Sequence, residues 1–334
     1  MKRVVFYILC IFYISTIFCA CTSDPKKTAL KELDRRKIPF TEQMFLAKAY
    51  EGDSDAIKQF ITAGINKEAR TTEDDYNALM IAAHAGHTEI VKLLLDSGLN
   101  VDGVDNTGVT ALMRAAVNGQ TYCVRILLEK GADANLKADG QKGMTALMFA
   151  AAAGQTNAVR LLLEKGANPD IRSTEGNQAL MFAQLSGNSE TVALLTSAAS
   201  NINTPNDKSI NALHIAIKRH EKEQAAILIT KGANVNAADN SGFTPLMLAC
   251  QEGDAATAKL LLERGAVINA AYTANGRSIT PLMIAAMKGH EPVVRLLMNN
   301  KVDTTVRDGQ GSDAAAYARH NGFEYIARII EGRD

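Results

Sequence analysis

The side chains best suited to covalent or metal chemistry in this sequence are five cysteines and six histidines. Cys123 and Cys250 lie far apart in the chain, and neither has a histidine or an acid at a spacing typical of a nucleophile or a metal site. No two histidines have the spacing of a zinc site. The sequence therefore predicts no metal and no cofactor.

Motifs that bind phosphate or activate a nucleophile are not found either. Gly309 and Gly311 form a weak glycine pair, but no strand pattern precedes them and the remaining glycine of a dinucleotide fingerprint is lacking. The acids are spread over positions typical of exposed helix faces and caps. Catalysis would need groups that converge from distant segments, so we predict a protein that is not an enzyme.

The balance of charge argues against a nucleic-acid partner. Lys and Arg number 36, as do Asp and Glu, which gives a formal net charge of zero. A protein that binds the phosphate backbone usually shows a basic run or a basic stripe interleaved with aromatic residues, and no such pattern is present.

The amino terminus has the pattern of a secretory signal. Lys2 and Arg3 precede an uncharged apolar stretch from Val4 to Phe18, which small residues and Cys21 follow. The stretch is shorter than the ~20 residues that a membrane-spanning helix needs. We predict a signal peptide over residues 1–20, and an uncleaved membrane anchor remains the alternative.

The end of this segment, Phe18-Cys19-Ala20-Cys21, resembles the lipobox of bacterial lipoproteins, although Phe18 and Cys19 depart from its usual residues. The resemblance implies that Cys21 receives a diacylglycerol and becomes the first residue of the mature chain, followed by a linker over residues 21–39. Thr22 after the cysteine implies the outer membrane. We therefore expect a lipid-anchored protein that lies in the periplasm or at the cell surface.

A four-residue phrase recurs along the chain at steps of 33, 35, 33, 33, 33 and 36 residues, and most copies end in Leu-Met. The copies begin at Asn77, Thr110, Thr145, Gln178, Asn211, Thr244 and Thr280. Divergent copies begin near Gln43 and Asp313, which gives nine units between residues 40 and 331. Later parts of the units also match, as in Ala82–His87 and Gly131–Asn135.

A period of 33 residues with this opening phrase resembles the ankyrin repeat. The resemblance implies an all-α ankyrin-repeat solenoid of helix-turn-helix units with β-hairpin loops, over residues 40–331. The units begin near residues 40, 74, 107, 142, 175, 208, 241, 277 and 310.

The residue types that recur within one unit can be explained physically. Thr, Asn or Asp before the first helix supplies an oxygen for unpaired amides, and Pro245 and Pro281 occupy the first helical position, where a missing N–H costs nothing. Helices of about two turns are unstable alone, so stability must come from stacking of one unit on the next. We expect a continuous core. Methionine replaces the family's histidine in six units, and since adjacent helices lie ~10 Å apart, core filling is expected rather than shared metal binding.

Ankyrin proteins bind partners on the concave face, so the resemblance implies the residue before each cap and the residues after the Ala-Ala pair as contacts. The residues before the caps are Tyr76, Val109, Met144, Ile210, Phe243 and Ile279. The inner helices present Tyr50, His84, Val117, Asn118, Leu185, Lys218, Arg219, Gln251, Glu252, Met287 and Lys288. An exposed apolar strip is a candidate interface; the alternative is that these side chains only shield the first helix.

Two hairpins, Lys137–Met144 and Asn269–Ile279, are longer than the period requires, and insertions in repeats often lie on the binding face. Asp139-Gly140 and Asn275-Gly276 are dipeptides suited to tight tips. We add Gln141, Lys142, Tyr272 and Arg277 to the candidate contacts. Neutral drift in a tolerant loop is the alternative.

One stretch departs from the pattern. Gln184 replaces an alanine, the usual ending is lost over residues 197–201, and His220 occupies a position that is glycine in most other units, where a side chain would strain a positive φ. We expect a soft junction between units five and six.

The sequence thus predicts a monomeric, membrane-anchored module that binds a protein partner. Three more specific roles remain open: an inhibitor or immunity-type protein that blocks a toxin or enzyme, a structural envelope scaffold, and an effector that meets proteins of another organism.

Overall fold

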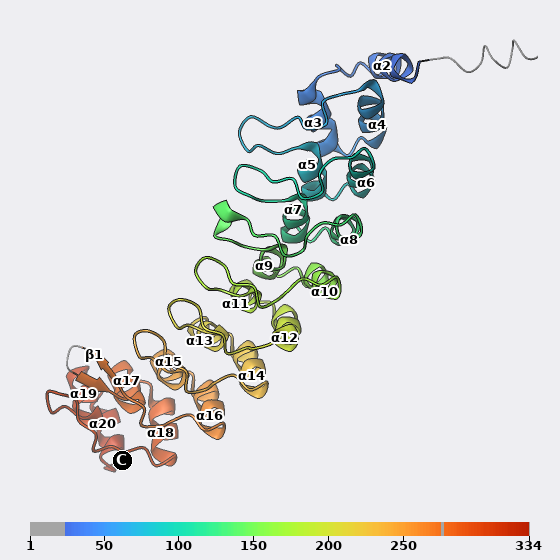
Figure 1. Ribbon diagram of the computed structural model, residues 1–334. Coiled ribbons are helices and arrows are strands. Elements are labelled where there is room, and N and C mark those ends of the chain that lie inside the picture. The colour runs from blue at the N-terminus through green and yellow to red at the C-terminus, as the bar shows by residue number, and fades with distance from the viewer. Residues whose placement is uncertain (1–23, 275–276, 334) are drawn as a thin grey trace, which may run out of the picture. The chain divides into compact units, whose positions relative to one another are not determined.

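The structure is a computed structural model that describes residues 24–274 and 277–333. The predicted signal peptide, Cys21 and the Asn275-Gly276 turn lie outside these residues. The described chain divides into two compact units, whose helices and strands are labelled in Figure 1. The first ends at residue 133 without residues 116–119, and the second comprises those four residues and the chain from residue 134 onward.

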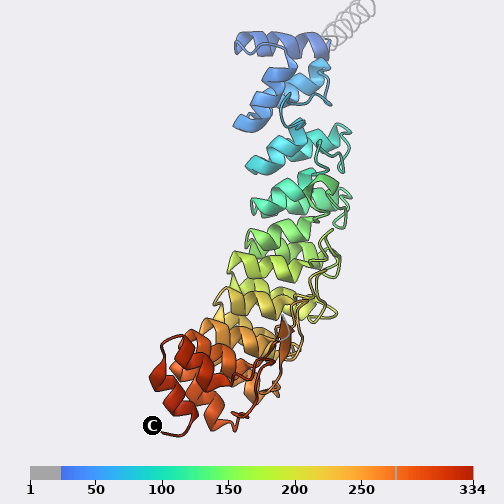
Figure 2. The ribbon, with the colours of Figure 1, turned by 90° about the vertical axis from the view of Figure 1, so that its left-hand side faces the viewer.

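The first unit is helical. Its helices are α2 (Pro25–Arg35), α3 (Glu42–Glu51), α4 (Ser54–Ala63), α5 (Ala78–Ala85), α6 (Thr88–Asp96), most of α7 (Ala111–Val117), and α8 (Thr121–Glu129). From α3 onward the helices form pairs, and the loop before each pair projects to one side (Figure 2).

The second unit continues the same pattern. Its helices are α9 (Ala146–Ala152), α10 (Thr156–Glu164), α11 (Ala179–Ser186), α12 (Ser189–Ala198), α13 (Ala212–Lys218), α14 (Lys222–Thr230), α15 (Pro245–Glu252), α16 (Ala255–Glu263), α17 (Pro281–Lys288), α18 (Glu291–Asn299), α19 (Ala314–His320) and α20 (Glu324–Ile330). A short 3₁₀ helix, η1 (Asp139–Gln141), and two antiparallel strands, β1 (Tyr272–Ala274) and β2 (Arg277–Ile279), occupy the two long loops. The predicted all-α solenoid is confirmed.

Helix α2 lies in the segment that the sequence analysis assigned to a linker. The Asp24 side chain accepts a hydrogen bond from the Lys26 amide, and Pro25 begins the helix, so its start is fixed locally. Ala29 and Leu33 are buried against α4. Residues 24–35 therefore cap the first helix pair.

The repeated phrase folds as its letters predict. The side chains of Asn77, Thr145 and Thr244 each accept a hydrogen bond from the amide three residues on, and Pro245 and Pro281 begin their helices. Core filling by the repeated methionines is confirmed, because all six are at most 2% exposed. They are Met80, Met113, Met148, Met181, Met247 and Met283.

A polar side chain in the turn between two paired helices bonds to the pair before it. In the first unit, the His87 Nε2 lies 2.8 Å from the Tyr50 carbonyl oxygen, and the Gln120 side chain donates to the His84 carbonyl at 3.3 Å. In the second unit, Gln155 donates to the Val117 carbonyl at 3.3 Å, Asn188 to that of Gly154 at 3.1 Å, and His290 Nε2 lies 3.0 Å from that of Gln251. We call these five side chains the turn ladder.

The turn ladder requires glycine in the preceding turn. Gly52 has φ 83°, and a Cβ there would lie only 2.6 Å from the His87 ring. In the unit where glycine is replaced, His220 has φ 59°, the positive value predicted from the sequence. The next residue, Glu221, occupies a ladder position, but a carboxylate cannot donate a hydrogen bond to a carbonyl. The ladder is therefore interrupted here, and it is interrupted in the same way at Asp254, the residue after Gly253.

Gln184 is a second irregularity in this region. Its side chain is fully buried in α11, and neither its Oε1 nor its Nε2 has a hydrogen-bond partner among the described residues. Ala83, Ala116 and Ala151 hold the equivalent place in the preceding pairs. These features support a soft junction, which remains a prediction.

We expect Gln184→Ala to raise the free energy of unfolding by about 1 kcal/mol, because a buried polar group without a partner costs about 1–3 kcal/mol and the lost packing offsets part of the gain. Chemical denaturation measures the change. The reciprocal control, Ala151→Gln, should destabilise the protein. A Gln184→Ala variant less stable than the wild type would contradict this assignment.

Candidate binding surface

The aromatic residues predicted as contacts in the first unit lie on its first two helix pairs or in the loop between them. Tyr50 is near the end of α3 and is 66% exposed. Tyr76 precedes the cap of α5 and is half-buried, while His84 is exposed on α5. The structure thus brings three predicted contacts to neighbouring positions.

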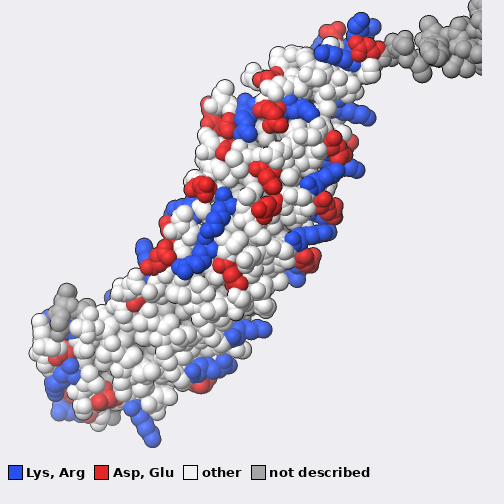
Figure 3. All heavy atoms as spheres, viewed as in Figure 1, with Lys and Arg blue, Asp and Glu red and all other residues white. Residues whose placement is uncertain are grey.

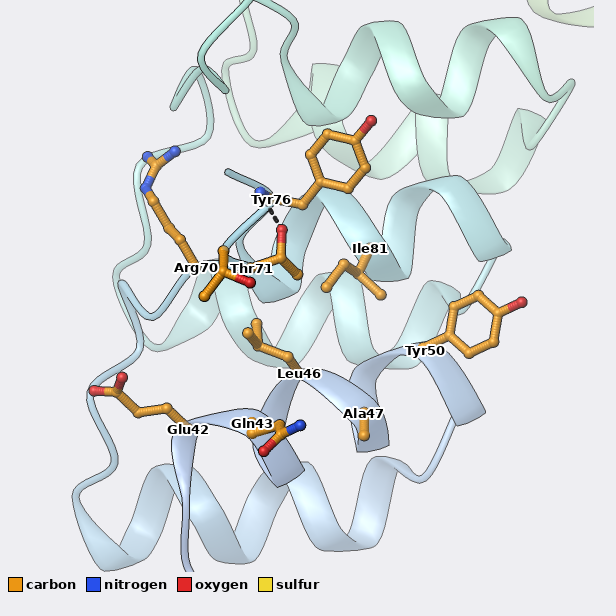
Figure 4. Close-up of a pocket in the computed structure, with 10 residues that line it drawn as sticks. Glu42, Gln43, Leu46, Ala47, Tyr50, Arg70, Thr71, Tyr76 and Ile81 are labelled. Carbon is orange, nitrogen blue, oxygen red and sulfur yellow. Dashed lines mark hydrogen bonds between the residues drawn. The ribbon is translucent and has the colours of Figure 1, made fainter. Parts of the chain in front are cut away.

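A groove of about 720 Å³ lies between α3, α5 and the loop before α5 (Figure 4). Leu46, Ala47 and Ile81 give it an apolar lining, and Figure 4 shows Tyr50 at one end and Glu42 near the other. Gln43, Arg70, Thr71, Thr72 and Tyr76 complete the lining. Of these lining residues, only Tyr50 and Tyr76 are among the contacts predicted from the sequence.

The Tyr76 side of the groove is fixed by a charged pair. The Arg114 guanidinium lies 4.2 Å from the centroid of the Tyr76 ring, a cation–π contact. Arg114 donates to the Asp105 carboxylate at 2.6 Å, and this carboxylate is fully buried. Burial would raise the pKa of Asp105, but hydrogen bonds from Arg114 and Thr107 and from the Val109 amide outweigh it and lower the pKa.

The loop that borders the groove is held in the same manner. Arg70 Nη1 donates to the Asp75 carboxylate at 2.8 Å and to the Asp75 and Val104 carbonyls, both at 2.9 Å. The Thr71 hydroxyl accepts from the Tyr76 amide at 2.9 Å (Figure 4). The groove is therefore preformed.

Other hairpins use one acidic side chain to fold their tips. Asp105 accepts from the Val109 amide at 3.0 Å, and Asp239 accepts from the Phe243 amide at the same distance. Phe243 is half-buried in this turn, but Val109 is only 4% exposed, and Ile279 at the end of β2 is only 5% exposed. For these two residues the structure favours the alternative, that they shield the first helix.

The second unit exposes the remaining candidates more sparsely. The Phe243 and Tyr272 rings pack with centroids 4.4 Å apart, so the hairpin that contains β1 and β2 contacts the loop before α15. Asn118, Leu185, Lys218, Arg219 and Lys288 are exposed. Met144, Val117, Ile210, Gln251, Glu252 and Met287 are half-buried.

The long loops bond to their neighbours at the tips. The Lys142 ammonium donates to the Glu175 carboxylate at 2.8 Å, and its neighbour Gln141 is exposed. Asp139 and Gly140 lie in η1, and the positive φ falls instead at Lys142 and Gly143, which corrects the predicted tight tip.

In the second long loop, Arg277 contacts the loop before α19. Arg277 bonds to Gln310 and lies 3.9 Å from the Asp308 carboxylate. Together with Tyr317 and His320 these residues line a small polar pocket of about 340 Å³. Tyr317 donates to Asp308 at 2.7 Å, so these polar groups already satisfy one another.

Within residues 24–274 and 277–333, no three His, Cys, Asp or Glu side chains are grouped as a metal site would require. Cys123 and Cys250 are buried, and burial raises the pKa of both thiols, which keeps them protonated. In the same part of the chain, no helix has the length and apolar character needed to span a bilayer.

The chain matches known repeat families. The family model of three ankyrin repeats matches residues 44–138, 134–206 and 198–272, and that of a single ankyrin repeat matches residues 278–309. The 26S proteasome non-ATPase regulatory subunit 10 of Mus musculus is 43% identical over 60 residues, or 18% of this chain and 26% of that protein. The Homo sapiens protein of that name is 42% identical over 60 residues, with the same shares of each chain.

A different kind of relative matches over a similar length. Glycerophosphocholine phosphodiesterase gde1 of Schizosaccharomyces pombe is 38% identical over 58 residues, which is 17% of this chain and 5% of that protein. The matched segment thus spans about a quarter or less of these curated relatives.

Asp105→Asn should lower the free energy of unfolding at neutral pH by about 1–3 kcal/mol, because Arg114 loses its charged partner. The folded-state pKa of Asp105 is lowered, so its contribution is complete above the unfolded pKa of about 3.9 and is lost as pH falls through the folded value. Denaturation curves should therefore converge for the two proteins in acid. A constant difference down to the acid limit would contradict this role.

Proposed function

The chain belongs to the ankyrin-repeat family, and from this premise we propose that it is a membrane-anchored module that holds a protein partner on its inner face. The observation that carries the proposal is the preformed groove beside Tyr50. An exposed aromatic ring next to a fixed apolar floor is the arrangement in which interface residues contribute most binding energy.

The charge around the groove indicates what the partner presents. From residue 38 onward, the first unit carries eight basic and fourteen acidic residues, and Glu42, Glu73 and Asp74 are exposed at the groove or on the loop beside it. Complementary charge favours a partner that places an aliphatic or aromatic side chain in the groove and basic groups around it.

The anchor part of the proposal comes from the sequence before the described chain. The lipobox-like ending at Cys21 supports a lipid anchor, and Thr22 supports the outer membrane. Several acyl chains give a firm anchor, because each buried CH₂ contributes roughly 0.8 kcal/mol. The array would then work in the periplasm or at the cell surface.

Tyr50→Ala should weaken partner capture by about tenfold or more, because it removes the exposed aromatic anchor. Tyr122→Ala is the matched control, since Tyr122 lies on α8 in the same unit, is 75% exposed and does not line the groove. Quantitative crosslinking and recovery of the full chain from native membranes measures both variants.

The expected result is one stoichiometric partner that is lost with Tyr50→Ala and kept with Tyr122→Ala. Recovery of a diffuse set of proteins, equal for both variants, would count against a specific binding module.

Metabolic labelling with a fatty acid tests the anchor. The wild type should incorporate label, and Cys21→Ser should not. Cys19→Ser is the control, because serine suits that lipobox position and Cys21 remains available. If the wild type takes up no label, the lipid anchor is wrong.

A further inference from the structure

Helix α2 carries a row of basic side chains along one face. Lys27, Lys31 and Arg35 recur every four residues, so they follow one another along one face of the helix. Lys27 and Lys31 are exposed, and the Arg35 side chain is 73% exposed. Ala29 and Leu33, on the opposite face, are buried on α4, so the basic face is turned outward.

Few of these charges are neutralised within the molecule. Arg35 pairs with Glu32 and Arg36 with Asp53, both at 2.6 Å. Lys26, Lys27, Lys31 and Lys37 have no ion pair in the described part of the chain. Figure 3 shows Lys and Arg side chains projecting where α2 lies. A helix that only capped the array would need a polar outer face but not one of this sign.

The segment that contains α2 is basic, whereas the rest of the described chain is slightly acidic. Residues 24–37 hold six basic and three acidic residues, whereas residues 38–333 hold 28 basic and 32 acidic residues. Much of the acid excess lies in the first unit itself, next to α2.

The distance from α2 to the proposed anchor is short. Pro25 is the fourth residue after Cys21, and four residues span at most about 14 Å even when fully extended. An anchored Cys21 thus holds the start of α2 close to the headgroups, within about one or two Debye lengths of 8–10 Å.

We propose that the basic face of α2 contacts anionic phospholipid headgroups of the membrane that carries the anchor, an inference that rests on the proposed lipidation of Cys21. Each lysine near an anionic surface strengthens the attraction about fivefold. The same surface repels the acidic helix pairs, so the groove stays clear of the lipid and open to a partner.

Amine footprinting of the full chain on vesicles tests this proposal. The purified protein is reconstituted in vesicles of phosphatidylcholine alone or mixed with phosphatidylglycerol, and acetylation of each lysine is followed by mass spectrometry. Lys27 and Lys31 should react about fivefold more slowly on the anionic vesicles. The difference should vanish near 1 M salt, where the Debye length falls to about 3 Å.

Lys92 is the internal control, because it is exposed on α6 of the same unit and should react equally on both vesicles. In Lys27→Gln/Lys31→Gln, the protection of Lys26 and Lys37 should also fall, whereas Lys92→Gln should leave it unchanged. Equal rates for Lys27 and Lys31 on neutral and anionic vesicles would overturn the proposal.

Failure of the anchor and failure of this inference give different results. Fatty-acid label at Cys21 with no dependence of the footprint on lipid charge leaves the anchor and refutes the headgroup contact. A charge-dependent footprint in an unlabelled chain supports the contact and refutes the anchor.

Discussion

A helix of two turns leaves most of its terminal amides and carbonyls without partners, and every helix pair in this chain must obtain those partners from outside. In five of the turns, the turn ladder supplies a partner on one side, where a His, Gln or Asn side chain bonds to a carbonyl at or just after the end of the preceding inner helix. The loops supply them on the other. Asn236 accepts from the Val267 amide at 2.8 Å and donates to the Gly265 carbonyl at 3.0 Å. Each pair is thus stable only with its neighbour.

Because each helix pair depends on its neighbour, the rigidity of a segment depends on how many of these bonds it has. In the first unit, the ladder bonds of His87 and Gln120 combine with the buried Asp105–Arg114 pair, so the side chains around the groove have fixed supports. In the second unit, Glu221 cannot continue the ladder, and Gln184 adds a buried amide without partners in the described chain. The fixed supports in the first unit favour binding at the groove, because a preformed site loses little entropy when it binds.

The sequence was sufficient where a local rule decides the structure. The period, the caps at Asn77 and Thr244 and the buried methionines all follow from residue types at fixed spacing. The sequence was insufficient where the exposure of a residue depends on how a loop packs against the helices. Val109 precedes a cap as Tyr76 and Phe243 do, yet Val109 is buried while the other two are half-buried, a difference that the position in the repeat does not predict. Leu46 and Ile81 meet only through stacking, so no linear pattern marks the groove.

Helix α2 was not predicted, although the sequence contains the pattern of a helix start. Asp24 and Pro25 form a recognisable helix start, but the nearby resemblance to a lipobox suggested a linker instead. The central claim is that a protein covers the groove when the chain is in its membrane. Tyrosine-selective labelling tests this claim most directly, because Tyr50 and Tyr122 are 66% and 75% exposed and should react alike in the purified protein. In native membranes, labelling of Tyr50 alone should fall severalfold relative to Tyr122. An unchanged ratio of the two would contradict the account.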